Sequence, residues 1–215
     1  MLYFKLLGME INLNCDLGEK SKHHSNENDP ELLKIVNSAN VACGYHAGDE
    51  QTMQEVVKIS RENNVSIGAH PSFKDPENFG RKRMDLSASE ITKLVTDQYE
   101  ILQNIASLQG EKVSHIKPHG ALNNMACEDL ELATTLAKTI YHIDKDIIYL
   151  VPTGSKMEIA AKKLNMKIAC EIFADRNYED DGTLVSRTKD HALITDPNQA
   201  KNHVLNMVKN QTLNC

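Results

Sequence analysis

Short apolar segments alternate with longer segments of helical periodicity along the chain, and this alternation constrains the fold most strongly. It is typical of βα units, in which helices cover a parallel sheet. Strands are expected at 9–15, 38–43, 65–69, 113–117, 147–151, 168–173 and 191–195. Helices are expected near 30–37, 50–63, 88–108, 129–142, 155–164 and 197–209. The sequence therefore predicts an α/β protein.

Six or seven parallel strands can form either a doubly wound sheet or a (β/α) barrel, and periodicity does not separate the two. Polar residues follow many of the predicted strands, whereas a doubly wound sheet concentrates its chemistry at one switch point. This distribution favours the barrel. We expect residues 1–215 to form a single domain, with residues 1–8 as an upstream start or an extra edge segment.

Charge and hydropathy exclude two classes of protein. The chain has 24 Lys and Arg against 30 Asp and Glu, a net charge of −6, and no basic stripe, which argues against nucleic-acid binding. The longest apolar stretches, such as 147–151, are far shorter than the roughly 20 residues that span a membrane. Five cysteines, none in a Cys-x-x-Cys pair, favour a reducing cytoplasm over a disulfide framework.

Reactive side chains follow five of the predicted strands. Because the carboxyl ends of barrel strands open on one face, these side chains are expected to converge there. The candidate catalytic residues are Asp16, His46, His70, Lys117, His119, Asp175 and Arg176. The candidate substrate-binding residues are Asn14, Glu19, Asp49 and Arg81, the last for an anionic group. The six other histidines, His115 among them, lack this context and are expected to be structural or solvated.

Two kinds of chemistry remain open for this set. Asp16, His46 and His70 could hold zinc or manganese with positions left for water, although no local spacing such as His-Glu-x-x-His supports this. Metal-free chemistry is preferred, in which imidazoles and carboxylates transfer protons while Lys117 or Arg176 stabilises an oxyanion. In this interpretation the carboxylates of two aspartates orient the histidines, namely those of Asp49 and Asp175.

Familiar nucleotide-binding motifs are absent from the sequence. The segment 150–156, LVPTGSK, lacks the first glycine of a phosphate-binding P-loop, and no G-x-G-x-x-G is present. Any nucleotide is therefore expected to bind through an unfamiliar loop or on another subunit.

Five motifs taken together resemble the LamB/YcsF family. In chain order, between about Met9 and Met207, they are INLNCDLGE, SANVACGYHAGD, GAHPSFKDPENFGRKRM, KPHGALNN and EIFADRNYEDDGTLVSR. The resemblance implies a (β/α) barrel of the glycoside hydrolase/deacetylase type. It also implies ATP-dependent opening of the 5-oxoproline lactam to L-glutamate, with hydrolysis of ATP to ADP and phosphate, in a complex with subunits B and C.

Lactam hydrolysis requires an activated carbonyl, a nucleophilic water and a protonated leaving nitrogen. On this basis we expect Asp16 or His70 to activate water and His119 to protonate the leaving nitrogen. Lys117 and Arg176 are expected to stabilise the oxyanion or a phosphate.

Some positions depart from the family pattern. Residues 20–23, Lys-Ser-Lys-His, replace the usual Ser-Phe-Gly after DLGE, Asn123 replaces a tyrosine, and Lys82 replaces an arginine. Family members usually continue with a further strand bearing His-Gly-Asp and a final helix, so the barrel is expected to be incomplete at its C-terminus. Two alternatives to the lactam-opening enzyme stay open: a metal-dependent deacetylase-like hydrolase and a truncated, non-catalytic assembly subunit.

Overall fold

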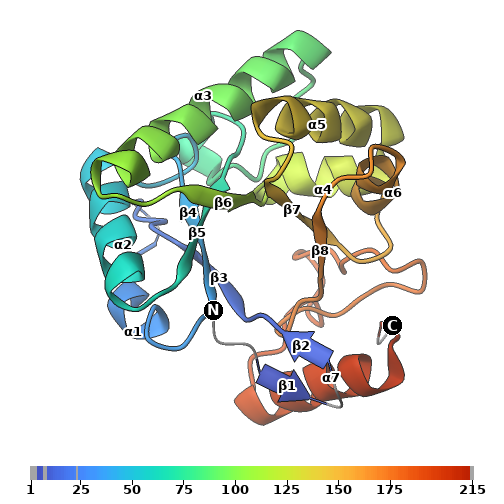
Figure 1. Ribbon diagram of the computed structural model, residues 1–215. Coiled ribbons are helices and arrows are strands. Elements are labelled where there is room, and N and C mark those ends of the chain that lie inside the picture. The colour runs from blue at the N-terminus through green and yellow to red at the C-terminus, as the bar shows by residue number, and fades with distance from the viewer. Residues whose placement is uncertain (1–3, 7–8, 23, 214–215) are drawn as a thin grey trace.

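A parallel sheet of six strands forms the centre of the protein, whose computed structural model describes residues 4–6, 9–22 and 24–213. Each strand pairs with the next one along the chain. The sheet curls into a half-barrel with helices on its outside (Figure 1). The strands are β3 (Asn14–Leu17), β4 (Ser38–Ala42), β5 (Ser66–His70), β6 (Val113–Ile116), β7 (Ile148–Pro152) and β8 (Ile168–Glu171). The predicted α/β barrel class is confirmed.

The helices follow the strands in the order expected for βα units. They are α1 (Asp29–Leu32), α2 (Glu50–Glu62), α3 (Ala88–Leu108), α4 (Gly120–Glu128), α5 (Leu130–Ile143), α6 (Lys156–Lys163) and α7 (Pro197–Asn210), with a short 3-10 helix, η1 (Pro76–Asn78). An antiparallel pair, β1 (Phe4–Leu6) and β2 (Met9–Ile11), precedes the sheet. Figure 1 shows this pair and α7 on the open side of the half-barrel, toward β3 and β8.

Three sequence expectations about elements differ from the structure. The predicted strand 9–15 is two strands, β2 and β3. The predicted strand 191–195 is wrong: Leu193 makes only an isolated bridge with Arg176 and is 42% exposed, so this short apolar run does not enter the sheet. Helix α4 is missing from the expectation, because Gly120 and two asparagines favour a loop when only the local pattern is considered.

Alternate residues of the strands separate an apolar layer from a polar one. Strand β4 is buried at all five positions, as expected for a strand covered on both sides. Ala39 and Val41 belong to the hydrophobic core that includes α2 and α3 residues such as Val57 and Val95. Asn40, between Ala39 and Val41, instead bonds to polar side chains of β3 and β6. The inner side of the half-barrel is therefore a polar chamber.

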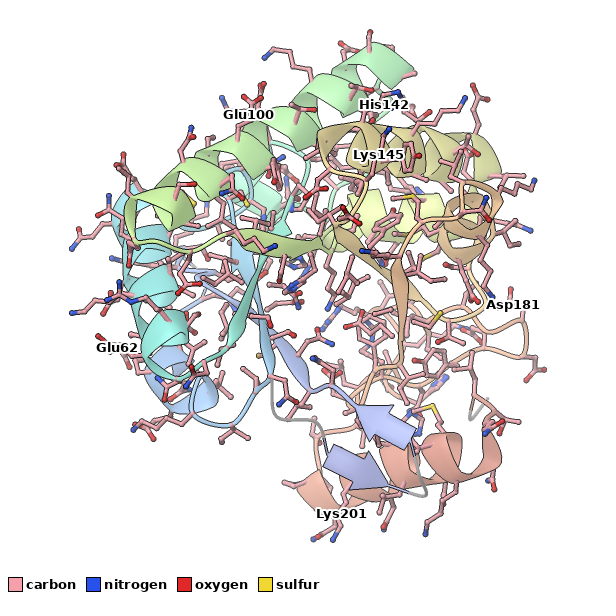
Figure 2. All side chains as sticks on the ribbon, in the orientation of Figure 1. Glu62, Glu100, His142, Lys145, Asp181 and Lys201 are labelled. Carbon is pink, nitrogen blue, oxygen red and sulfur yellow. The ribbon has the colours of Figure 1, made fainter. Side chains whose placement is uncertain are left out.

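A 25-residue stretch without helices or named strands, residues 172–196, separates β8 from α7. Asp181 lies at the outer edge of the molecule in this stretch (Figure 2), and its carboxylate accepts hydrogen bonds from the backbone and hydroxyl groups of Thr183. This matches a turn rather than a site residue.

No helix in the described part of the chain is long and apolar enough to cross a membrane. The four cysteines in the described ranges, Cys15, Cys43, Cys127 and Cys170, are all free thiols. These four residues therefore form no disulfide framework.

Gly68 of β5 allows a buried ring to lie directly over the strand. A Cβ atom at this position would lie 2.1 Å from Cδ2 and Nε2 of His115. The His115 ring is buried and cannot easily move, because its Nε2 atom bonds to the side chain of Asn40. Any side chain at position 68 would therefore displace the ring from the polar chamber.

We expect Gly68→Ala to lower the free energy of unfolding by about 1–3 kcal/mol through overpacking. Denaturant unfolding would measure this change in wild type and in a His115→Ala background. The loss should be smaller in that background, because the ring is absent. Equal losses in the two backgrounds would contradict the steric explanation.

Candidate functional site

A buried lysine joins two carboxylates at the carboxyl ends of the strands. Lys117, just after β6, donates hydrogen bonds from Nζ to Asp16 Oδ1 of β3 at 3.0 Å and to Glu171 Oε1 of β8 at 2.7 Å. Lys117 and Glu171 are buried, whereas the Asp16 side chain is 33% exposed. Asp16 is therefore the member of this network that a small molecule can reach.

Electrostatics keep Asp16 and Lys117 ionised. Partial removal from water would raise the pKa of Asp16. The positive charges of His70 and Lys117 have the larger, opposite effect and hold this pKa well below its usual range. Burial would likewise lower the pKa of Lys117, yet Asp16 and Glu171 raise it above its ordinary value. Asp16 is a carboxylate and Lys117 an ammonium group at neutral pH.

A second layer of hydrogen bonds fixes the Asp16 carboxylate. Asn40 donates from Nδ2 to Asp16 Oδ1 at 2.8 Å and to Asn14 Oδ1 at 2.7 Å. The side-chain oxygen of Asn40, Oδ1, accepts a hydrogen bond from His115 Nε2 at 3.0 Å. A chain of donors thus runs from His115 through Asn40 to Asp16.

Glu19 and three histidines form a second cluster beside Asp16. One donor atom of each of Glu19, His46, His70 and His119 lies within 4.8 Å of all the others. Glu19 Oε1 is 3.0 Å from His46 Nε2, 3.2 Å from His119 Nδ1 and 3.8 Å from His70 Nε2. His70 Nε2 also lies 3.3 Å from Asp16 Oδ2, so the two clusters meet at this nitrogen.

The three histidine rings are held firmly. His46 and His119 stack with centroids 3.9 Å apart, and Phe79 packs edge-on against both rings. Gly80, at a φ of +64°, lies so close that a Cβ atom would be 2.9 Å from His46 Cβ and 2.1 Å from Ser72 Oγ. Only glycine fits this turn without displacing the histidines.

The protonation of the histidines differs within the cluster. Burial and the charge of His70 lower the pKa of His46 to about 3, and burial with the same charge lowers that of His119 well below its usual value. Burial would also lower the pKa of His70, but Asp16 and Glu19 raise it. The cluster therefore concentrates negative charge around the His70 nitrogen and favours a bound cation there.

The structure brings many of the predicted site residues together. Seven of them lie in the two connected clusters: Asn14, Asp16, Glu19, His46, His70, Lys117 and His119. Arg81 is at the margin, where its guanidinium lies 4.9 Å from the centre of the Phe79 ring. The metal ligands considered from the sequence were Asp16 and two histidines, whereas the structure groups Glu19 with three histidines and places Asp16 next to them.

The remaining three predicted residues make other contacts. Asp49 caps α2, and its Oδ1 accepts hydrogen bonds from Thr52 N and Oγ1. Arg176 is buried, and its guanidinium donates to the carbonyl oxygens of Val185 and Ala192. Asp175 is exposed. No contact between these three side chains and the site histidines is seen among the described residues.

Asn40, His115 and Glu171 belong to the site network but are absent from the sequence candidates. Asn40 is a polar residue inside a fully buried strand, which is a usable signal because buried polar groups need partners. Glu171 is the last residue of β8 and opens the EIFADR motif. His115, expected to be structural or solvated, is buried and bonds to Asn40 through Nε2.

Neutral His115 makes folding depend on pH. Burial and the charges of Lys117 and His70 lower its pKa from 6.5 to about 3. Between these values the unfolded chain binds a proton that the folded chain does not, so stability falls as the pH falls. We expect His115→Gln to reduce this slope by up to one proton, about 1.4 kcal/mol per pH unit.

Urea unfolding between pH 4 and pH 7 would measure this slope for wild type and variant. The control is His142→Gln, since His142 is exposed on the outside of the helices (Figure 2) and should leave the slope unchanged. An unchanged slope in His115→Gln would show that His115 does not titrate in this way.

Comparisons with known proteins agree with the geometry. The family model described as "LamB/YcsF family" matches residues 11–215. Two proteins from Staphylococcus aureus, of strains bovine RF122 / ET3-1 and MSSA476, are named as the A subunit of 5-oxoprolinase. Each is 43% identical to this chain over 201 residues, and the match covers 94% of this chain and 80% of theirs.

A solved structure shows the same fold. The crystal structure of the lactam utilization protein from Thermus thermophilus superimposes with a TM-score of 0.87 and 35% sequence identity. The match covers 94% of this chain and 81% of the other chain. On the family match and the identity to its relatives, the chain belongs to the LamB/YcsF family.

Proposed function

We propose that this protein is the A component of an ATP-dependent 5-oxoprolinase. It would act in the cytoplasm with subunits B and C and open the 5-oxoproline lactam to L-glutamate. The observation that carries the proposal is the 43% identity, over 94% of the chain, to proteins named as the A subunit of 5-oxoprolinase. The name of the Thermus thermophilus protein also refers to lactam utilization.

Asp16 is the best placed general base of the site. Its carboxylate is ionised, partly exposed and fixed by Lys117 and Asn40. In the proposed reaction it accepts a proton from the attacking water and passes that proton to the lactam nitrogen as the C–N bond breaks. One base then serves both steps: the water is divided between the new carboxyl group and the amine, and ATP is hydrolysed to ADP and phosphate with a second water.

A positive charge is needed where the lactam oxygen becomes an oxyanion. Lys117 is one source, since its ammonium group lies 3.0 Å from Asp16 Oδ1. The histidine cluster is the other source, because the carboxylates beside His70 favour a cation there. Arg176 has the carbonyl oxygens of Val185 and Ala192 as partners, so we assign it to holding the 172–196 stretch.

ATP is proposed to be consumed on the partner subunits. The Gly-Ser-Lys segment after β7 supports this, because the Gly154 amide already has an acidic partner and the Ser155 amide donates to the carbonyl oxygen of Pro152. Gly154 N donates to Glu158 Oε2 at 2.7 Å, and Ser155 Oγ accepts from Glu158 N as the helix cap. A phosphate at the Gly154 amide would have to displace the Glu158 carboxylate.

A metal-dependent amide hydrolase is the second candidate. The cluster of Glu19 with His46, His70 and His119 is the observation that favours it. The two candidates differ in their requirements, because only the second would hydrolyse an amide with a metal ion and without ATP.

We expect Asp16→Asn to lower kcat for glutamate release by about 10²–10⁴-fold, the usual contribution of a general base. The assay mixes the purified chain with its cognate B and C subunits and 5-oxoproline, with and without ATP. Asp146→Asn is the matched control, because Asp146 pairs with Lys167 at the surface and its side chain is 81% exposed.

The outcomes separate the candidates. ATP-dependent glutamate from wild type and Asp146→Asn, with little from folded Asp16→Asn, is the expected result. Full activity in Asp16→Asn would exclude Asp16 as the base. Complex formation without any glutamate would overturn the proposed function and favour a non-catalytic role in assembly.

A further inference from the structure

We propose that Glu19, His46, His70 and His119 bind one Zn²⁺ ion. The ligand atoms are Glu19 Oε1, His46 Nε2, His70 Nε2 and His119 Nδ1, which form the cluster described above. The inference concerns binding by this chain alone, and it does not depend on the lactam reaction or on subunits B and C.

The backbone fixes which nitrogen of two histidines carries the proton. His70 Nδ1 lies 2.6 Å from the carbonyl oxygen of Lys117, and His119 Nε2 lies 2.9 Å from that of Phe79. A carbonyl oxygen only accepts hydrogen bonds, so each of these nitrogens must be an N–H donor. In the neutral rings the lone pairs are consequently on His70 Nε2 and His119 Nδ1.

These two lone pairs face each other at 2.9 Å, and Glu19 Oε1 lies 3.2 Å from His119 Nδ1. Acceptors that converge in this way repel one another unless a proton on His70 Nε2 or a metal ion lies between them. Backbone carbonyls behind ligating histidines are also the usual outer shell of protein metal sites, where they set the tautomer. The arrangement is therefore one in which a metal ion can take the place of the proton on His70 Nε2.

The separations of the ligand atoms fit a tetrahedral ion. Ligands at about 2.0–2.1 Å from zinc lie about 3.3 Å from one another in a tetrahedron. Glu19 Oε1 is 3.0, 3.2 and 3.8 Å from the three nitrogens, and the two facing nitrogens are 2.9 Å apart. The ligand atoms lie up to 4.8 Å apart and the His46 and His119 rings are stacked, so one of these two rings must turn for both to point a nitrogen at the same ion.

The donor set and its surroundings select zinc. Three imidazole nitrogens with one carboxylate oxygen suit Zn²⁺, whereas Mg²⁺ and Ca²⁺ prefer oxygen ligands. The three rings are at most 7% exposed, while Glu19 and Asp16 are partly exposed on the same side. Asp16 Oδ2 lies 3.3 Å from His70 Nε2, next to the four ligands but outside the set.

Binding is tested with Zn²⁺ alone on the full chain. The protein is stripped with a chelator and dialysed, and zinc is titrated by isothermal calorimetry, with the metal content measured by mass spectrometry. We expect one equivalent in wild type and at least a 100-fold weaker affinity in His46→Ala and Glu19→Gln. The control His142→Ala, in an exposed side chain on α5, should bind like wild type.

A spectroscopic measurement on the wild type tests the proposal even if the variants do not fold. Co²⁺ in place of zinc should give the intense visible absorption of a four-coordinate site, and zinc should displace it. The proposal is overturned if wild type binds less than one equivalent or gives only the weak spectrum of six-coordinate Co²⁺. It is also overturned if folded Glu19→Gln and His46→Ala bind zinc as wild type does, in which case the ion binds elsewhere on the chain.

Discussion

The ion pairs of Lys117 connect the two ends of the open sheet. Strands β3 and β8 are the first and last of the sheet and share no backbone ladder in the described structure. Lys117, which follows β6, bonds through one ammonium group to Asp16 of β3 and to Glu171 of β8. A buried charge left without its partner typically costs about 3–5 kcal/mol, so these three side chains depend strongly on one another.

The rest of the chamber is organised around this charge. Asn40 satisfies Asp16 from the side of β4, and His115 holds Asn40. His115 can occupy its position because Gly68 has no side chain. A polar interior of this kind is stable only when its donors and acceptors are paired. Here the ammonium group of Lys117, the amide of Asn40 and the imidazole of His115 each bond to a neighbouring polar side chain.

Much of the fold could be predicted from the sequence because strand and helix periods are local properties. The alternation predicts the six parallel strands, but it also predicts a strand at 191–195. In the structure this segment pairs with no strand of the sheet, and Leu193 makes an isolated bridge with Arg176. The convergence of Asp16, the histidines and Lys117 followed from the topology of parallel strands. What the local pattern could not show was the partner of each side chain.

Pairings across the chamber explain the differences at the site. Glu19, expected to bind substrate, lies among the histidines. Arg176 instead bonds to backbone carbonyls 9 and 16 residues further along the chain. The partner of Asp49, Thr52, is only three residues away. A helix cap could therefore have been predicted for Asp49 from the local sequence, in place of a contact with substrate or a histidine. Distant contacts such as His115 with Asn40, 75 residues apart, depend on the finished sheet.

Residue 117 serves the two halves of the site through different atoms. Its ammonium group donates a hydrogen bond to the Asp16 carboxylate, while its main-chain oxygen accepts a hydrogen bond from His70 Nδ1. The oxygen of Phe79 does the same for His119. Since main-chain atoms persist through any substitution, the two hydrogen bonds that set the tautomers of these imidazoles do not depend on side-chain identity at 79 and 117. The carboxylate half can therefore be altered, in evolution or by design, while these two main-chain hydrogen bonds to the histidines are retained.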